Sequence, residues 1–354
     1  MNLHIGTQIR TRSRARLILA TATVAVASMA MAGCVAGEGT PTGDVVEGSE
    51  WSDTTLTLDF ATYNPLSLII KDQGWLEAEL GDDVSVQWVQ SAGSNKANEA
   101  LRAGAIDVGS TAGSAALLAR SNGSPIQTII IFTQPNWSAI AVAPGSDIAK
   151  VSDLVGRTVA ATKGTDPYFF LLQTLGEAGL SLDDISLQNL QHADGKTALE
   201  TGAVDAWAGL DPLLATSVAN GAAEIIYDNV DFNSYGFLNA TEDFITSHPD
   251  LAQLVVNTYE KARAWALENS DETAAILAEV AGIDIAIAQA TIARTVIDID
   301  PVPGATQRAV LEVIGPIFVE SGDVPNQEVI DTALDSLFND VFVRVADPDA
   351  VGGQ

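Results

Sequence analysis

The residues best suited to chemistry in this sequence lie where helices are predicted to begin. Residues 163–167 precede an apolar helical pattern, with Thr165 or Asp166 placed as the N-cap and a proline at the first helical position. Backbone N–H groups at such a helix start, together with the helix dipole, bind oxyanions without a fixed positive charge. Ser110 and Thr111 offer a similar start with two hydroxyl groups. The alternative is that Thr165 and Ser110 only cap helices.

A second candidate pair, Trp207 and Asp211, lies in residues 204–212, where a strand is predicted to enter a cleft. In that position Trp207 would form an aromatic wall, and Asp211 would accept a hydrogen bond from an amine or hydroxyl of a ligand. The alternatives are that Trp207 belongs to the core and that Asp211 only caps the helix that follows it.

Groups for catalysis are scarce. Beyond residue 33 the histidines are His192 and His248, and neither has a metal-ligating neighbour at a useful spacing. Residues 109–113 lack the lysine of a P-loop, and no glycine-rich dinucleotide motif follows a predicted strand. We therefore expect a protein that is not an enzyme and that holds no cofactor and no metal.

The elements that would position these residues are predicted by an internal repeat. The template Leu-x-x-Gly-Ala-(β-branched)-Asp occupies residues 101–107 and 199–205. In each copy a helix ends at a glycine that can take a positive φ, and an Asp opens a short buried strand. A ligand site forms at the carboxyl ends of such strands, so the repeat predicts two similar lobes that face each other across a cleft.

From residue 56 onward short apolar strands alternate with helical patterns, which predicts an α/β fold with helices on both faces of each sheet. Residues 139–143 and 235–238 are the candidate hinge strands between the lobes. After residue 247 the pattern is helical and should pack on the first lobe. The predicted division is lobe 1 at 54–144 plus 237–354 and lobe 2 at 145–236.

The first 33 residues are typical of a lipoprotein signal peptide. Four arginines and no acid precede an apolar run of roughly 16 residues, shorter than the ~20 that span a bilayer. Met31-Ala-Gly-Cys34 closes the segment, and because Cys34 is the only cysteine, lipidation is expected instead of a disulfide or a free thiol. Residues 34–53 lack periodicity and predict a flexible tether. We expect an extracytoplasmic protein, lipid-anchored to the outer face of the cell membrane.

The acidic composition narrows the choice of partners. A formal net charge of -29 excludes nucleic acid as a partner, because phosphates would be repelled. The 47% of hydrophobic residues allows a sizeable core. The acidic surface itself is better explained by solubility than by binding.

Four stretches in chain order resemble one family, the substrate-binding lipoproteins of ABC importers for aliphatic sulfonates and taurine, within the wider nitrate/sulfonate/bicarbonate group. The similarity runs from about residue 56 to residue 338. Its most specific parts are Pro65-Leu66 with Gly74-Trp75, residues 94–111, residues 161–168 and residues 204–212.

The resemblance implies the two-lobed periplasmic-binding fold of type II, with two hinge crossovers and closure of the lobes on a ligand. It also implies delivery of the ligand to a membrane permease with a cytoplasmic ATPase. Carried over position by position, the ligand contacts of the family fall on Tyr63, Asn64, Ser110, Thr111, Trp137, Gly164, Thr165, Asp166, Tyr168, Trp207 and Asp211.

The expected function is capture of a small anionic solute, taurine or an alkanesulfonate, by a monomer that serves an ABC importer. One alternative is a binding protein for a related anion or heteroaromatic compound, such as nitrate, bicarbonate or a pyrimidine precursor. Another is a sensor that reports ligand occupancy to a receptor kinase. A desulfinase-like lyase on the same scaffold would need a cysteine in the cleft, and Cys34 is assigned to lipid.

The lipid assignment predicts that Cys34→Ala releases the protein from the membrane without changing ligand binding, because the tether lies outside the predicted fold. Cell fractionation measures the release, and calorimetry measures the binding. A variant that stays in the membrane fraction would contradict the assignment.

Overall fold

The computed structural model describes residues 51–352, which belong to the compact unit Gly43–Gln354. The predicted signal peptide, Cys34 and most of the predicted tether lie outside the described residues. Among residues 51–352, no helix combines the length and apolar character needed to cross a membrane.

The first of two sheets has six strands in the order β11-β4-β10-β3-β1-β2. The strands are β1 (Thr55–Phe60), β2 (Ser85–Gln90), β3 (Val108–Ala112), β4 (Ile126–Pro135), β10 (Gly236–Thr241) and β11 (Thr295–Val296). β1 pairs in parallel with β2 and β3, whereas β10 is antiparallel to β3 and β4. Helices make the crossovers that parallel pairing requires. They are α1 (Pro65–Gln73), α2 (Trp75–Leu80), α3 (Ser94–Arg102) and α4 (Gly113–Ser121).

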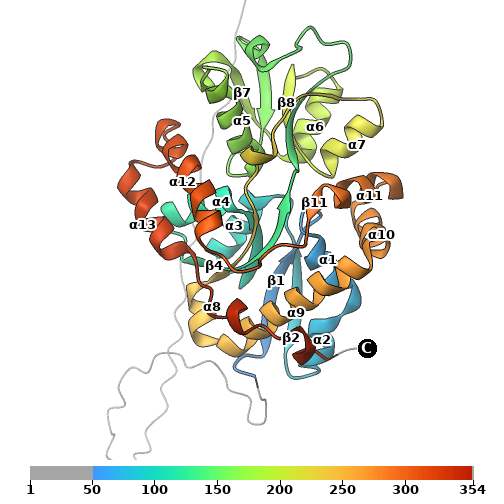
Figure 1. Ribbon diagram of the computed structural model, residues 1–354, viewed down its shortest axis with the longest axis vertical. Helices are drawn as coiled ribbons and strands as arrows, with labels where there is room; N and C mark the ends of the chain where they lie inside the picture. The colour runs from blue at the N-terminus through green and yellow to red at the C-terminus, as the bar shows by residue number, and fades with distance from the viewer. Residues whose placement is uncertain (1–50, 353–354) are drawn as a thin grey trace, which may run out of the picture. The chain divides into compact units, whose positions relative to one another are not determined.

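The second sheet has five strands in the order β7-β6-β8-β5-β9. The strands are β5 (Ser138–Val142), β6 (Thr158–Ala161), β7 (Ser186–Asn189), β8 (Ala206–Leu210) and β9 (Glu224–Asp228). β6 is parallel to β7 and β8, and β5 is antiparallel to β8 and β9. The helices of this part are α5 (Asp166–Glu177), α6 (His192–Glu200) and α7 (Leu213–Ala219). Five strands of the first sheet, β4-β10-β3-β1-β2, thus have the same arrangement as β9-β5-β8-β6-β7 in the second. Figure 1 shows α5, α6 and α7 beside β7 and β8 of the second sheet.

The chain passes from the first sheet to the second between β4 and β5, and returns between β9 and β10. β5 is a full member of the second sheet, although residues 139–143 were expected as a hinge and residue 144 as the end of lobe 1. Its backbone groups bond to β8 and β9, so they cannot serve as a free hinge. The connecting segments are residues 136–137 and 229–235.

The remaining helices follow β10. They are α8 (Glu242–Ser247), α9 (Pro249–Glu268), α10 (Ser270–Ala281), α11 (Ile285–Ala293), α12 (Ala305–Glu320) and α13 (Gln327–Leu337). α9 and α10 pack on α1, and α12 and α13 pack on α4 (Figure 1). α11 also contacts α7, and the ring of Phe318 in α12 lies 4.4 Å from that of Phe169 in α5. The C-terminal helices thus contact elements of both sheets, beyond the expected packing on the first lobe.

The repeat has the structure that the sequence predicts. Its glycines, Gly104 and Gly202, have φ values of 64° and 73°. The carboxylate of Asp107 accepts a hydrogen bond from the backbone N–H of Thr57 at 2.8 Å, and that of Asp205 accepts one from Thr158 at 2.7 Å. Each repeat Asp therefore fixes the neighbouring parallel strand near its amino end, on the sheet edge opposite the expected ligand site.

We predict that Asp107→Ala and Asp205→Ala each lower the free energy of unfolding by about 1–3 kcal/mol, because each leaves a strand N–H without its acceptor. Urea denaturation measures the change, with Asp82→Ala at an exposed position as the control. Two variants as stable as that control would show that these bonds do not hold the strands.

Candidate functional site

The carboxylate of Asp166, the first residue of α5, lies at the centre of the contacts between the two sheets and is 1% exposed. Its Oδ1 accepts hydrogen bonds from Ser114 Oγ at 2.6 Å and Ser234 Oγ at 2.7 Å. Its Oδ2 accepts from Trp137 Nε1 at 2.7 Å and the backbone N–H of Ser234 at 2.9 Å. Ser114 belongs to α4, whereas Trp137 and Ser234 lie in the two connecting segments.

These four bonds give Asp166 a role that differs from the expected ligand contact. Burial raises the pKa of Asp166, and the hydrogen bonds from Ser114, Ser234 and Trp137 oppose that shift. A second anion beside this carboxylate would be repelled, and the donors it needs are already engaged. Asp166 therefore joins α4, α5 and both connecting segments.

Tyr63 and Trp137 lie edge to face, with ring centroids 6.0 Å apart and an interplanar angle of 86°. The hydroxyl of Tyr63 donates to the carbonyl of Ser110 at 3.0 Å. Asn64 instead caps α1, because its Oδ1 accepts from the N–H of Ser67 at 3.2 Å. The structure thus brings Tyr63 and Trp137 to the Asp166 cluster and uses Asn64 to start a helix.

The hydroxyls expected to bind an anion in the first lobe have partners in their own sheet. Ser110 donates through Oγ to Asp59 at 3.0 Å and through its backbone N–H at 2.8 Å. Thr111 Oγ1 donates to the carbonyl of Ala112 at 2.9 Å and accepts from Asn239 at 2.8 Å. These contacts leave little capacity for a ligand.

Asp59, the partner of Ser110, is buried in the first sheet. Burial raises the pKa of Asp59 to about 7, against the opposing hydrogen bonds from Ser91 and Ser110. A folded-state pKa above the usual value of 3.8 means that the stabilising contribution of Asp59 is complete below pH 3.8 and is lost as the pH rises through about 7.

The loop after β6 keeps more capacity for an anion. Thr165 is the N-cap residue of α5, yet its Oγ1 donates to the carbonyl of Thr162 at 2.6 Å, and no side chain caps the helix. Gly164 precedes it with a φ of 77° and is half-buried. The expected side-chain cap is therefore wrong in detail. In the first turn of α5, Pro167 has no N–H and the N–H of Tyr168 donates to the carbonyl of Thr165 at 3.1 Å, which leaves the N–H of Asp166 without such a bond.

Asp211 does not have a free carboxylate. Its Oδ2 lies 3.2 Å from Arg294 Nη1, and its Oδ1 accepts from the N–H of Ala215 at 3.0 Å. Burial raises the pKa of Asp211 to about 6, and the charge of Arg294 opposes the shift. Arg294 also donates to the carbonyl of Asn136 at 2.6 Å. The expected acceptor for a ligand amine is thus engaged by an arginine and a helix N–H.

Arg294 is the residue of this candidate site that the sequence analysis did not single out. It follows α11, about 80 residues after Asp211 in the chain, so no local motif joins the two. One signal was available: Arg294 is the only lysine or arginine between Arg263 and Arg308, in an acid-rich stretch.

Trp207 and Tyr168 make their side-chain contacts outside the Asp166 cluster. Trp207 is 1% exposed and packs with Leu199 and Leu214 in the core of the second sheet, so the core alternative applies to it. It also touches α6 so closely that a Cβ on Gly195 would lie 2.8 Å from its Nε1. The hydroxyl of Tyr168 donates to Asp323 Oδ2 at 3.1 Å, in the link between α12 and α13.

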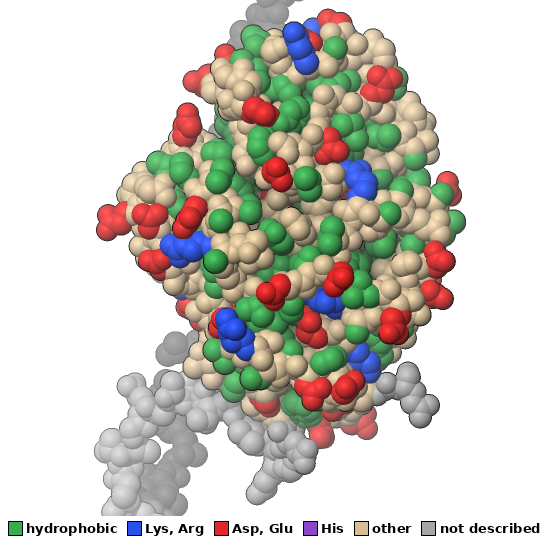
Figure 2. Space-filling view, in the orientation of Figure 1, with side chains coloured by type: hydrophobic (Ala, Val, Ile, Leu, Met, Phe, Trp, Pro, Cys, Tyr) green, Lys and Arg blue, Asp and Glu red, His purple; other side chains and the backbone are tan. Residues whose placement is uncertain are grey.

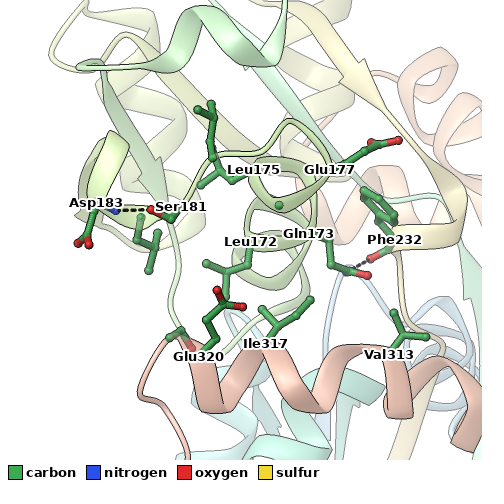
Figure 3. Close-up of a pocket in the computed structure, with 14 residues that line it drawn as sticks. Leu172, Gln173, Leu175, Glu177, Ser181, Asp183, Phe232, Val313, Ile317 and Glu320 are labelled. Carbon is green, nitrogen blue, oxygen red and sulfur yellow. Dashed lines mark hydrogen bonds between the residues drawn. The ribbon is translucent and has the colours of Figure 1, made fainter.

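Predicted site residues line one small cavity and are absent from the lining of a much larger one. One of about 10 Å³ lies among Tyr63, Trp137 and Asp211. A cavity of about 750 Å³ lies between α5 and α12, where Figure 3 shows Leu172 and Gln173 opposite Val313, Ile317 and Glu320. None of the predicted site residues lines this larger cavity.

The visible face carries scattered carboxylates and fewer cationic side chains (Figure 2). In residues 51–352 no cluster of His, Cys, Asp or Glu side chains could hold a metal ion.

Comparison with known proteins identifies relatives of this chain. The profile of the NMT1/THI5-like family matches residues 68–273, which is more than half of the chain. A protein of Escherichia coli (strain K12), named a putative aliphatic sulfonates-binding protein, is 32% identical over 200 residues, covering 56% of this chain. The aligned region spans 63% of the length of that relative, less than two thirds.

Solved structures have the same fold. The crystal structure of the periplasmic aliphatic sulphonate binding protein SsuA from Escherichia coli covers 79% of this chain and 91% of its own, with 26% identity and a TM-score of 0.67. The desulfurization enzyme DSZB has the fold at 16% identity and a TM-score of 0.61, covering 82% of this chain and 97% of its own. The predicted α/β periplasmic-binding fold is confirmed.

The Asp166 cluster predicts that Asp166→Ala lowers the free energy of unfolding by at least ~3 kcal/mol, roughly the value of two charged hydrogen bonds. Asp166→Asn should cost less, because its carbonyl oxygen still accepts. Chemical denaturation of both variants measures the difference. If Asp166→Ala were as stable as Asp82→Ala, the cluster would not hold these segments together.

Proposed function

The chain belongs to the NMT1/THI5-like family, and we propose that it is the extracytoplasmic solute-binding component of an ABC importer that captures an aliphatic sulfonate. The observation that carries this proposal is the 32% identity over 200 residues to a relative named for binding aliphatic sulfonates. A lipid at Cys34, a monomeric state and a permease with a cytoplasmic ATPase are parts of the same proposal.

The loop that precedes α5, at Gly164 and Thr165, is the part of the predicted site that lies outside the Asp166 hydrogen-bond cluster, and we propose the sulfonate there. A sulfonate stays ionised at physiological pH and accepts several hydrogen bonds, so backbone N–H groups that lead into a helix, together with the helix dipole, suit it. Arg294, which is paired with Asp211, also donates to the carbonyl of Asn136 next to Trp137. These donors can act locally against the net charge of -29, because screening beyond roughly 8 Å weakens the distant acids.

Binding also requires space. The cavity of about 10 Å³ beside Trp137 and Asp211 is comparable to the room that one water needs. A sulfonate is larger. The cavity of about 350 Å³ that Gly164 lines together with Asn95 and Asn98 has room for it, and we propose that the sulfonate binds there.

Binding without catalysis is the simpler proposal for this chain. The E. coli relative and SsuA are named as binding proteins. A covalent lyase mechanism would need a nucleophile such as a thiolate, and the sequence has no cysteine beyond Cys34.

We predict that alkanesulfonates or taurine raise the thermal stability of the protein, whereas nitrate, bicarbonate and pyrimidine precursors do not. A ligand at 100 times its Kd stabilises the folded state by ~2.7 kcal/mol, which a thermal-shift assay detects. Propionate is the matched control for ethanesulfonate, since the two differ in the anionic group. Stabilisation by nitrate or a pyrimidine precursor alone would replace the sulfonate proposal with one of those solutes.

A further inference from the structure

Four buried acceptor atoms lie where the start of α3 approaches the loop after β7. They have no hydrogen-bond partner within the described part of the chain. The atoms are Asn95 Oδ1, Asn98 Oδ1, Gln191 Oε1 and His192 Nε2. We call this group the acceptor junction. A buried acceptor without a donor costs free energy, so several together at one place point to a group that supplies donors.

The atoms of the acceptor junction come from both lobes. Asn95 and Asn98 are one turn apart on α3 and line the same cavity as Gly164. His192 begins α6 and faces α3, since a Cβ on Gly93 would lie 2.9 Å from His192 Nε2 and 3.0 Å from Asn95 Oδ1. A ligand held there would contact both sides of the predicted cleft.

The bonding of His192 shows that its free nitrogen accepts. Thr162 Oγ1 donates its proton to the carbonyl of Leu190 at 2.6 Å, so it must accept from His192 Nδ1 at 3.1 Å. With the proton on Nδ1, Nε2 carries a lone pair. His192 is 2% exposed, and burial lowers the pKa of its ring to about 4, which keeps it neutral near pH 7.

Asn98 also has one atom bonded as a donor and one acceptor atom left free. Its Nδ2 donates to the carbonyl of Ala115 at 3.0 Å, which leaves Oδ1 as the free atom. The carboxylates of the candidate site lack this freedom, because Asp166 and Asp211 already have donors. The unused capacity to accept a hydrogen bond is therefore found at the acceptor junction.

The junction adjoins the proposed sulfonate position. A Cβ on Gly164 would lie 3.5 Å from Asn95 Cβ, and Gly164 is two residues before α5. A solute with an anionic end at the start of α5 could thus place its other end at the junction.

Resting on the proposed function, we propose that the acceptor junction binds the ammonium end of an aminoalkanesulfonate, with N–H donors directed to His192 Nε2, Asn95 Oδ1 and Gln191 Oε1. An ammonium group has three N–H donors. His192 Nε2 and Asn95 Oδ1 both lie about 3 Å from one point beside Gly93, and Gln191, whose Oε1 is also unpaired, precedes His192 in the chain. A plain alkanesulfonate would leave these atoms unpaired, and sites built for a hydrogen bond reject analogues that lack it.

The test compares taurine with ethanesulfonate by calorimetry, because the two ligands differ in the amine. We expect the wild type to bind taurine at least about tenfold more tightly, and His192→Phe to lose at least about tenfold for taurine and under about twofold for ethanesulfonate. The control His248→Phe changes the other described histidine, which lies beside α9, and should leave both affinities unchanged.

A second variant keeps the test decisive if His192→Phe fails to fold. Asn95 is half-buried, so Asn95→Asp can place a carboxylate at the junction. It should raise the preference for taurine over ethanesulfonate by about threefold or more, because a charge replaces a neutral acceptor.

The outcomes separate the two proposals. Wild-type binding of ethanesulfonate that equals or exceeds that of taurine would overturn the junction proposal and leave the proposed function intact. Equal losses for both ligands in His192→Phe, or an unchanged preference in Asn95→Asp, would mean that water satisfies the acceptors, and would also overturn it. Failure of the wild type to bind either sulfonate would overturn the proposed function, and the junction proposal with it.

Discussion

The need to supply donors to one buried carboxylate, that of Asp166, governs how the two sheets meet. An ionised carboxylate removed from water is costly unless hydrogen bonds replace those it loses. Here the donors come from Ser114, Trp137 and Ser234, which are separated in sequence from Asp166 and belong to three different segments. Each segment must therefore stay within about 3 Å of the start of α5 for the carboxylate to remain buried.

The two ends of the parallel strands carry different kinds of contact. Asp107 and Asp205 bond to backbone N–H groups near the amino ends, where they hold strand to strand. The opposite ends lead into the starts of α3, α4, α5 and α6, and the unpaired acceptors lie on α3 and at the start of α6. The repeat Asp residues therefore act at the edge opposite the proposed ligand site, whereas Asp166 acts beside it.

Local patterns predicted the fold, whereas the contacts of single side chains were harder to foresee. The repeat, with Gly104 and Gly202 at positive φ, follows from residue type and spacing alone. Trp207 was assigned to the cleft although strand alternation allowed either side, and it packs in the core because α6 covers that face. The pairing of Asp211 with Arg294 depends on how the C-terminal helices fold back, which no local window contains.

The distribution of donors and acceptors bears on how so acidic a protein could hold a sulfonate. With a net charge of -29, an added monoanion meets repulsion that only nearby donors can offset. A zwitterion adds no net charge, so its ammonium gains from the same field that opposes its sulfonate. Donors at the start of α5 and acceptors around His192 would align such a dipole. The acidity of the chain and the polarity of this region therefore favour the same class of solute.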